Sequence, residues 1–318
     1  MHSLNSDGDS PSGEVTHWFR DHGYDFVVFS DHNFYTDLRA LQLEFDQESE
    51  RHGKRPFVLI HGEEVSDQYI DGNLRYVVHV NGIGTNHVVG IQGGTDIRDV
   101  LQSVIDKIHE AGGFPHLNHP NFCWSFTTED IMATTGLRHL EIANCHPAVH
   151  NSGGGGCPSS EEIWDTILSD GRILYGIASD DAHQFQTWGP EQANPGRGWV
   201  VVRAGSHTPE AIKKALYEGD FYASTGVELD DISSGGGTLK LNIHQQGKPK
   251  KQWGMINANK YRTTFIGEGG TVLKVEDSLE PSYTLQANEL YARARIDSSV
   301  GAKAWTQPLF AEGKGRFE

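Results

Sequence analysis

Short apolar runs that end in histidine or carboxylate residues constrain this chain more than any other feature of its sequence. One run covers residues 26–29 and another covers residues 57–60, and each is followed within a few positions by such a residue. When successive strands each end in a polar residue, the loops at one edge of a parallel sheet gather those residues into one site. The residues that follow the runs in this way are His32, Glu64, His79, His119, Asp181 and His183.

The first 225 residues read as an alternation of short strands and helices. The clearest helix is expected at residues 97–111, where Val100, Leu101, Val104, Ile105 and Ile108 fall on one face. Alternating strands and helices predict an α/β fold with a mostly parallel sheet. Further strands are expected at 137–143 and 172–177, and further helices at 36–51, 161–168 and 209–217.

The pattern changes after Gly226 to alternating apolar and polar residues, which indicates antiparallel strands. We therefore predict two domains, an α/β metallohydrolase unit over residues 1–226 and a β-rich lobe over residues 227–318. The lobe is expected to supply no metal ligand. Its strands are expected at 239–243, 261–265, 271–275, 283–287, 290–296 and 304–310.

Composition excludes several classes of protein. The 26 Lys and Arg residues against 43 Asp and Glu residues give a net charge of −17, which argues against nucleic acid as a partner. No apolar run approaches the ~20 residues of a membrane span, so a soluble protein is expected. The three cysteines have no C-x-x-C spacing and do not fix the redox compartment. Oligomeric state cannot be predicted.

Several segments occur in the order typical of the PHP (polymerase and histidinol phosphatase) family, and the chain resembles that family over about residues 1–225. The resemblance implies a distorted (β/α)7 barrel with up to three divalent metal ions, zinc, manganese or iron, at the carboxyl ends of its strands. The segments are His2 to Gly8, Ser30 to Asn33, Gly62 to Glu64, His79, His119 with Pro120, and Ser179 to His183.

The resemblance implies a role for each of these residues. A first metal would be held by His2, Glu64 and Asp181, with a further histidine two positions ahead of His2. A second would be held by Glu64, His79 and His119, and a third by Asp7, His32 and His183. The implied activity is a phosphoesterase that hydrolyses small-molecule phosphomono- or diesters through a metal-bound hydroxide. Glu64, Asp181 and His183 would be the catalytic residues.

The sequence departs from the family pattern at its first residues, because Met1 takes the place between two expected histidines. We therefore expect a segment ahead of Met1, which could carry a targeting signal and leaves a secreted or periplasmic location open. Without the first histidine, the first metal should be the weakest bound.

Some residues allow two interpretations. Glu63 competes with Glu64 as the bridging carboxylate, although strand alternation should point Glu63 away. Asp7 could bind a metal, or its side chain could serve only in an Asx turn. Arg197 is the candidate contact for a substrate phosphate, because a guanidinium matches phosphate geometry, but a surface role is equally open. Two other functions also stay open, a metal-dependent hydrolase or lyase on an amide or glycoside, and a degenerate module without activity.

Overall fold

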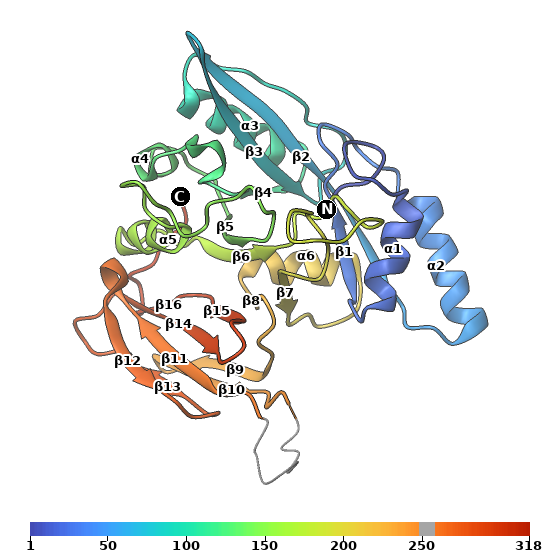
Figure 1. Ribbon diagram of the computed structural model, residues 1–318. Helices are drawn as coiled ribbons and strands as arrows, with labels where there is room; N and C mark the ends of the chain where they lie inside the picture. The colour runs from blue at the N-terminus through green and yellow to red at the C-terminus, as the bar shows by residue number, and fades with distance from the viewer. Residues whose placement is uncertain (248–257) are drawn as a thin grey trace.

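The computed structural model describes residues 1–247 and 258–318. The first part of the chain is built around a six-stranded sheet whose strands lie in chain order (Figure 1). The pairs β1–β2, β4–β5 and β5–β6 are parallel, and the pairs β2–β3 and β3–β4 are antiparallel. The strands are β1 (Phe26–Phe29), β2 (Val58–Asp71), β3 (Leu74–Ile83), β4 (Phe114–Leu117), β5 (His139–Asn144) and β6 (Tyr175–Ser179).

Helices flank this sheet and begin at recognisable capping residues. The predicted amphipathic helix α3 buries its apolar stripe against β2, β3 and β4, and the Asp96 side chain caps its first turn. In α5, Ser159 and Glu162 form a capping box. None of the helices within the described ranges is long and apolar enough to span a bilayer. They are α1 (Ser12–Asp21), α2 (Arg39–His52), α3 (Ile97–Glu110), α4 (Thr128–Met132), α5 (Ser160–Ser169) and α6 (Pro209–Glu218).

The predicted (β/α)7 barrel is wrong for this structure. β2 and β3 form a hairpin that turns at Gly72, where φ is 58°, and a hairpin can only be antiparallel. β7 (Trp199–Val202) pairs with β8 (Phe221–Ser224) in a different, antiparallel sheet. The six-stranded sheet is therefore mixed and has two edges, β1 and β6, among the described residues.

Most strands after Gly226 lie close to where the alternating pattern predicts them, but the strand β9 (Leu229–Gly235) was not predicted. They form two antiparallel sheets, with the orders β13-β10-β9 and β12-β11-β14-β15-β8-β7, and β16 pairs with β14. The second sheet includes β7 and β8, which precede Gly226, and the division at residue 226 stays a prediction. The later strands are β9 (Leu229–Gly235), β10 (Thr238–Ile243), β11 (Tyr261–Ile266), β12 (Val272–Glu276), β13 (Ser282–Thr284), β14 (Tyr291–Ser298), β15 (Lys303–Thr306) and β16 (Leu309–Phe310).

A buried ion pair joins the β-rich part to the first part. The Arg293 guanidinium on β14 donates hydrogen bonds of 2.7 and 2.6 Å to the Asp165 carboxylate on α5. The Tyr291 hydroxyl donates to the same carboxylate at 3.1 Å. Both charged side chains are buried, so their mutual contact is needed to offset the loss of hydration.

The C-terminal residues return to the first part of the fold (Figure 1). Ile173 donates a backbone hydrogen bond to Arg316, and Arg172 lies 2.9 Å from the Glu318 carboxylate. The Gln307 amide also bonds both backbone groups of Gly176, at 2.8 and 2.9 Å. These contacts hold one side of the amino-terminal half of β6.

Candidate metal centre

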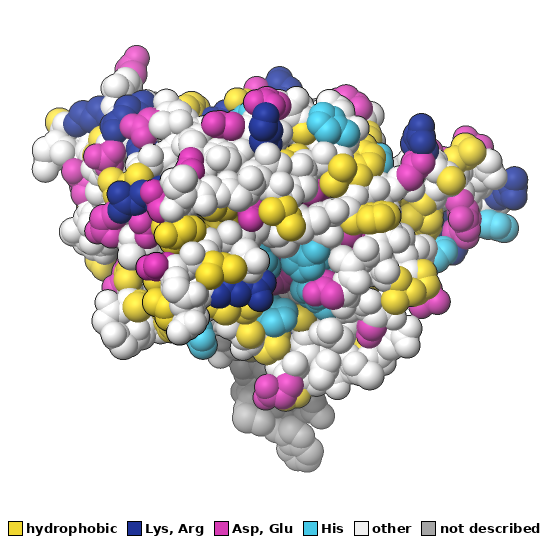
Figure 2. All heavy atoms as spheres, turned by 90° about the horizontal axis from the view of Figure 1, so that it is seen from above, with side chains coloured by type: hydrophobic (Ala, Val, Ile, Leu, Met, Phe, Trp, Pro, Cys, Tyr) yellow, Lys and Arg dark blue, Asp and Glu magenta, His cyan; other side chains and the backbone are white. Residues whose placement is uncertain are grey.

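All eight residues predicted as metal ligands meet at the carboxyl ends of β1, β4 and β6 and along the β2–β3 hairpin. Figure 2, which views this end of the sheet, shows histidine side chains gathered in a hollow beside an acidic side chain. Three overlapping groups within the described residues place potential ligand atoms within 4.8 Å of one another. These groups are His2, Asp7, His32 and His183; His32, Glu64 and His79; and His2, Glu64 and Asp181.

Glu64 lies at the centre of this cluster and is 1% exposed. Its Oε2 is 3.2 Å from His2 Nε2, and that nitrogen is also 3.2 Å from Asp181 Oδ1. This is the set predicted for the first metal position. The two carboxylates therefore share one imidazole.

Asp7 forms the outer side of the cluster and leaves more than half of its side chain exposed. Its oxygens lie 3.3 Å from His183 Nε2, 3.5 Å from His32 Nε2 and 3.7 Å from His2 Nδ1. The His2 and His183 rings stack at a centroid distance of 4.0 Å. The residues predicted for the third metal, Asp7, His32 and His183, therefore lie together, and His2 lies beside them.

Two buried atoms at the inner end of the cluster, Glu64 Oε1 and His79 Nδ1, form no well-aligned hydrogen bond among the described residues. They lie 2.7 Å apart, and His119 Nε2 is 3.7 Å from the same oxygen. Unsatisfied buried lone pairs are costly, and a shared cation would satisfy both. Mixed imidazole and carboxylate donors suit zinc, manganese and iron, so the residues present fit divalent metals.

The protonation of the cluster also fits a cation site. Burial acts to raise the pKa of Glu64, but the neighbouring imidazoles, above all His79, outweigh it and hold that pKa well below its usual range. Burial opposes protonation of His119, yet Glu64 and Asp181 outweigh it and raise the pKa of His119 to about 9. The carboxylates therefore stay ionised and hold protons on nearby imidazoles, and bound metals would displace those protons.

Three residues of this region adopt a backbone conformation that non-glycine residues rarely take. Asp181 has φ of 50°, Asn33 beside His32 has φ of 49°, and His119 has φ of 20°. Such conformations persist where surrounding contacts hold them, and they gather at functional sites. Here they turn the chain directly after β1, β4 and β6.

Glu141 on β5 supports the cluster from behind and is 2% exposed. Its carboxylate accepts hydrogen bonds from the His119 backbone at 2.7 Å and from the Ser179 hydroxyl at 2.6 Å. Asn144 donates from the same Nδ2 to Glu141 and to Asp181, at 2.9 and 3.2 Å. One buried carboxylate thereby positions two of the predicted ligands.

Two neighbouring carboxylates have other partners. Glu63 points away from Glu64 and accepts backbone hydrogen bonds from Val89 and Gly90 at 2.5 and 2.9 Å. Asp180 accepts backbone hydrogen bonds from residues 196–198. Each therefore holds a loop.

Arg197 uses its guanidinium within its own loop. It donates to the carbonyl oxygens of Gln192 and Gly189 at 2.6 and 2.7 Å, and to the Asn194 side chain at 2.8 Å. The structure gives this side chain a loop-stabilising role, and a contact with substrate phosphate stays a prediction.

His146 also borders the cluster, although the sequence did not single it out. Its ring meets the His183 ring edge-on at a centroid distance of 5.6 Å. Its Nδ1 accepts a hydrogen bond from the Ala148 backbone, which leaves the proton of the neutral ring on Nε2. Its position in the sequence could have identified it, because it lies two residues after the end of β5, just as His32 and His119 follow the ends of other strands.

Comparisons with known proteins add little to this geometry. No family model matches the chain, and no curated protein matches it. A solved structure from Bifidobacterium adolescentis, described as a candidate metal-dependent phosphoesterase, aligns with 61% of this chain and 87% of its own, at a TM-score of 0.39 and 14% sequence identity. That similarity is too weak to support an argument about fold or function.

Proposed function

We propose that this protein is a metal-dependent phosphoesterase that hydrolyses small-molecule phosphomono- or diesters. The observation that carries the proposal is the buried carboxylate of Glu64, which lies among His2, His79 and His119. One of its oxygens forms no well-aligned hydrogen bond in the described part of the chain. A buried anion ringed by imidazoles is the arrangement that a bridging metal ligand needs.

The proposed ligands are those named from the sequence. His2, Glu64 and Asp181 would hold one divalent ion, Glu64, His79 and His119 a second, and Asp7, His32 and His183 a third. When bound, the metals would supply Lewis acidity and activate water near neutral pH. Metal identity is left open among zinc, manganese and iron.

The charge of the loaded site favours an anionic substrate. The three ligating carboxylates contribute about −3, so two divalent ions would leave a net charge of about +1 and three would leave about +3. Without metals, protonated imidazoles such as His119 offset part of the carboxylate charge, and the hollow carries less positive charge than the loaded site. Binding of a phosphate ester should therefore be much stronger with the metals bound, even though the protein as a whole carries a charge of −17.

The chain's own residues would fix the geometry of this site. Glu141 and Asn144 hold His119 and Asp181 in strained backbone conformations that solvent-exposed loops would not keep. Asp9 accepts backbone hydrogen bonds from Phe185 and Gln186, which fixes the loop directly after His183. Positioning of this kind is the main requirement of phosphoryl transfer.

Metal analysis combined with a substrate panel tests the proposal. Protein purified without chelator should contain two or three divalent ions per chain and should hydrolyse nitrophenyl phosphate mono- or diesters. His119→Ala and His183→Ala should lose roughly 10³-fold in kcat, because several kcal/mol of charge stabilisation disappear. His87→Ala, at an exposed position, is the matched control and should retain full activity.

Three outcomes would contradict the proposal in different ways. Less than one metal ion per chain, with no activity after addition of Mn²⁺ or Zn²⁺, would overturn the metallohydrolase assignment. Turnover of ester, amide or glycoside analogues but of no phosphate ester would keep the metals and reject the substrate class. Full activity in His119→Ala or His183→Ala would reject the ligand assignment.

A further inference from the structure

His146 lies at the edge of the metal centre without being one of its predicted ligands. It follows β5 by two residues, and its half-buried ring meets the His183 ring at a centroid distance of 5.6 Å. Burial lowers the pKa of His146, and the ionisable groups with the largest effect on that pKa all belong to the cluster. They are Asp181, His183, His119 and His2. The ring therefore lies within reach of whatever the centre binds.

The backbone of His146 is held by the same side chain that supports a predicted ligand. Its N–H donates a hydrogen bond of 2.8 Å to Asn144 Oδ1, and Asn144 Nδ2 donates to Asp181. Asn144 is itself fixed, because its backbone N–H and carbonyl oxygen both bond the Asn151 side chain, at 3.0 and 2.7 Å. His146 is thus positioned by hydrogen bonds that lead directly to the metal centre.

One nitrogen of the His146 ring is already in use, and this sets the chemistry of the other. Nδ1 accepts a hydrogen bond of 3.1 Å from the Ala148 backbone, so the ring proton is on Nε2. Nε2 forms no hydrogen bond within residues 1–247 and 258–318. A neutral ring held in this form can donate a hydrogen bond, but it cannot give up its proton without becoming an imidazolate. The ring is therefore suited to be a fixed donor and not a general acid.

The cluster has few other donors to offer a bound anion. In the described part of the chain, the ion-pair partners of Asp7, Glu64 and Asp181 are all histidines that are themselves predicted ligands. Arg197, the predicted phosphate contact, uses its guanidinium within its own loop. The N–H of His146 is not committed in either way.

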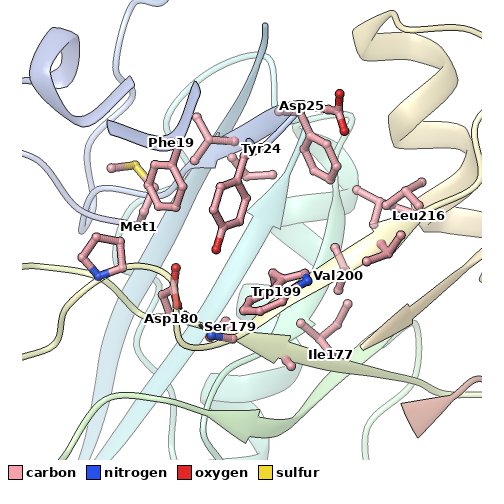
Figure 3. Close-up of a pocket in the computed structure, with 18 of the residues that line it drawn as sticks. Met1, Phe19, Tyr24, Asp25, Ile177, Ser179, Asp180, Trp199, Val200 and Leu216 are labelled. Carbon is pink, nitrogen blue, oxygen red and sulfur yellow. Dashed lines mark hydrogen bonds between the residues drawn. The ribbon is translucent and has the colours of Figure 1, made fainter. Parts of the chain in front are cut away.

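A cavity of about 990 Å³ reaches the cluster from another side, and Figure 3 shows it with Asp180 at one end. Near the cluster it is lined by the carboxylates of Glu64, Glu141, Asp180 and Asp181, and His146 does not line it. An approaching phosphate would meet carboxylates on the cavity side and an N–H donor on the His146 side. Like charges repel, so the phosphate should bind on the His146 side.

We infer that His146 Nε2–H donates a hydrogen bond to a phosphoryl oxygen of the substrate, on the His183 side of the metal centre. The inference rests on the proposed phosphoesterase function and adds to it a residue that contacts the substrate without being a metal ligand. The same oxygen is present in the substrate and in the phosphate product. The contact should therefore strengthen the binding of both.

Three substitutions at His146 test this contact in the metal-loaded protein. His146→Ala removes the donor, His146→Asn carries an amide that is too short, and His146→Gln can place an amide N–H near the position of Nε2. In the first two variants, the Kd for inorganic phosphate and the KM for a nitrophenyl phosphate should rise roughly 10- to 100-fold, as expected for a lost hydrogen bond to a charged group. His146→Gln should recover most of the affinity, and kcat should change much less than KM.

His150→Ala is the matched control, because it removes an exposed imidazole from the same loop. The His150 ring stacks on Trp124 at a centroid distance of 4.8 Å, and this variant should bind phosphate like the parent protein. Metal content should equal that of the parent in all four variants, because none of them removes a predicted ligand.

Several outcomes would overturn the inference. Unchanged phosphate affinity in His146→Ala would do so, and so would equal losses of affinity in His146→Gln and His146→Ala. Loss of bound metal in His146→Ala would show that the residue acts through His183. A fall in kcat with unchanged KM and phosphate affinity would assign His146 to proton transfer instead of binding. Failure of the proposed function is a separate result, because the metal-loaded parent would then hydrolyse no phosphate ester at all.

Discussion

The neighbouring residues Glu63 and Glu64 allow a paired test of the metal centre, because both are buried carboxylates on β2 that point in opposite directions. Glu64→Gln keeps the size of the side chain and removes its charge. Its Oε1 and Oε2 lie 2.7 Å from His79 and 3.2 Å from His2, so the change removes the anion that two metal positions share. Glu63→Gln makes the same change where the carboxylate bonds only backbone amides.

The two substitutions are expected to differ in metal affinity, which should fall for Glu64→Gln, whereas Glu63→Gln should change only the free energy of unfolding. Loss of an outer hydrogen-bond partner of a ligand costs about 10- to 100-fold in metal affinity, and loss of a bridging ligand should exceed that. Glu64→Gln should therefore lose at least about 100-fold in affinity for its most tightly bound metal. In Glu63→Gln, one of two charge-assisted hydrogen bonds is lost, which should reduce the free energy of unfolding by about 1.5–3 kcal/mol.

Metal titration by calorimetry and urea unfolding of the metal-free proteins separate the two effects. Glu64→Gln should fail in the titration and should also unfold at lower urea, because the imidazoles that hold the pKa of Glu64 low lose their counter-charge. Glu63→Gln should titrate like the parent and unfold at lower urea. Loss of metal affinity in both variants to a similar extent would refute the assignment of Glu64 as the shared ligand.

Three further predictions test the electrostatics of the fold. Burial lowers the pKa of His139 to about 3. The contribution of this residue to the free energy of unfolding should therefore be full above pH ~6.5 and should fall by up to ~1.4 kcal/mol per pH unit between pH ~6.5 and ~3. Urea unfolding at several pH values should show a flatter slope for His139→Gln than for the parent protein. Asp165→Ala leaves Arg293 buried without its main partner and should cost about 3–5 kcal/mol, whereas Asp277→Ala, at the exposed pair with Arg262, should change little; equal effects would contradict the buried-pair argument. Chelator should lower Tm reversibly, and a metal present at about 100 times its Kd should restore about 2.7 kcal/mol; an unchanged Tm would argue against tight binding.

The clustering of the predicted ligand residues could be foreseen because its signal is local. His32, His119 and His183 follow apolar runs directly, and strands of one sheet bring their ends to one edge whatever lies between them. Glu64 was separable from Glu63 because the Gly-x-Glu spacing of the family that the sequence resembles favours Glu64, and strand alternation points Glu63 the other way. His146 was missed although it follows the strand predicted at 137–143, because its meeting with His183 depends on the path of a loop.

The topology could not be predicted in the same way. The apolar run that ends in His79 is compatible with two structures, a parallel strand after a helix and the second strand of a hairpin. The short turn at Gly72 makes it the second strand of a hairpin. The pairing of β7 with β8, rather than with β6 or β1, depends on contacts between distant segments. The pattern of apolar residues predicts which face of a strand is buried, but it does not determine which strand it pairs with.

The return of Arg316 and Glu318 to the first part of the fold has a consequence during synthesis. Arg316 bonds to Asp170, 146 positions earlier, and Gln307 bonds to Gly176 of β6, so β6 and the residues just before it lack these contacts while the intervening chain is being translated. At ~5–20 residues per second, the nascent first part would wait roughly 7 to 30 seconds with that side of β6 uncovered. Ribosome-bound intermediates of this protein should therefore be a favoured substrate of chaperones that recognise exposed strand edges.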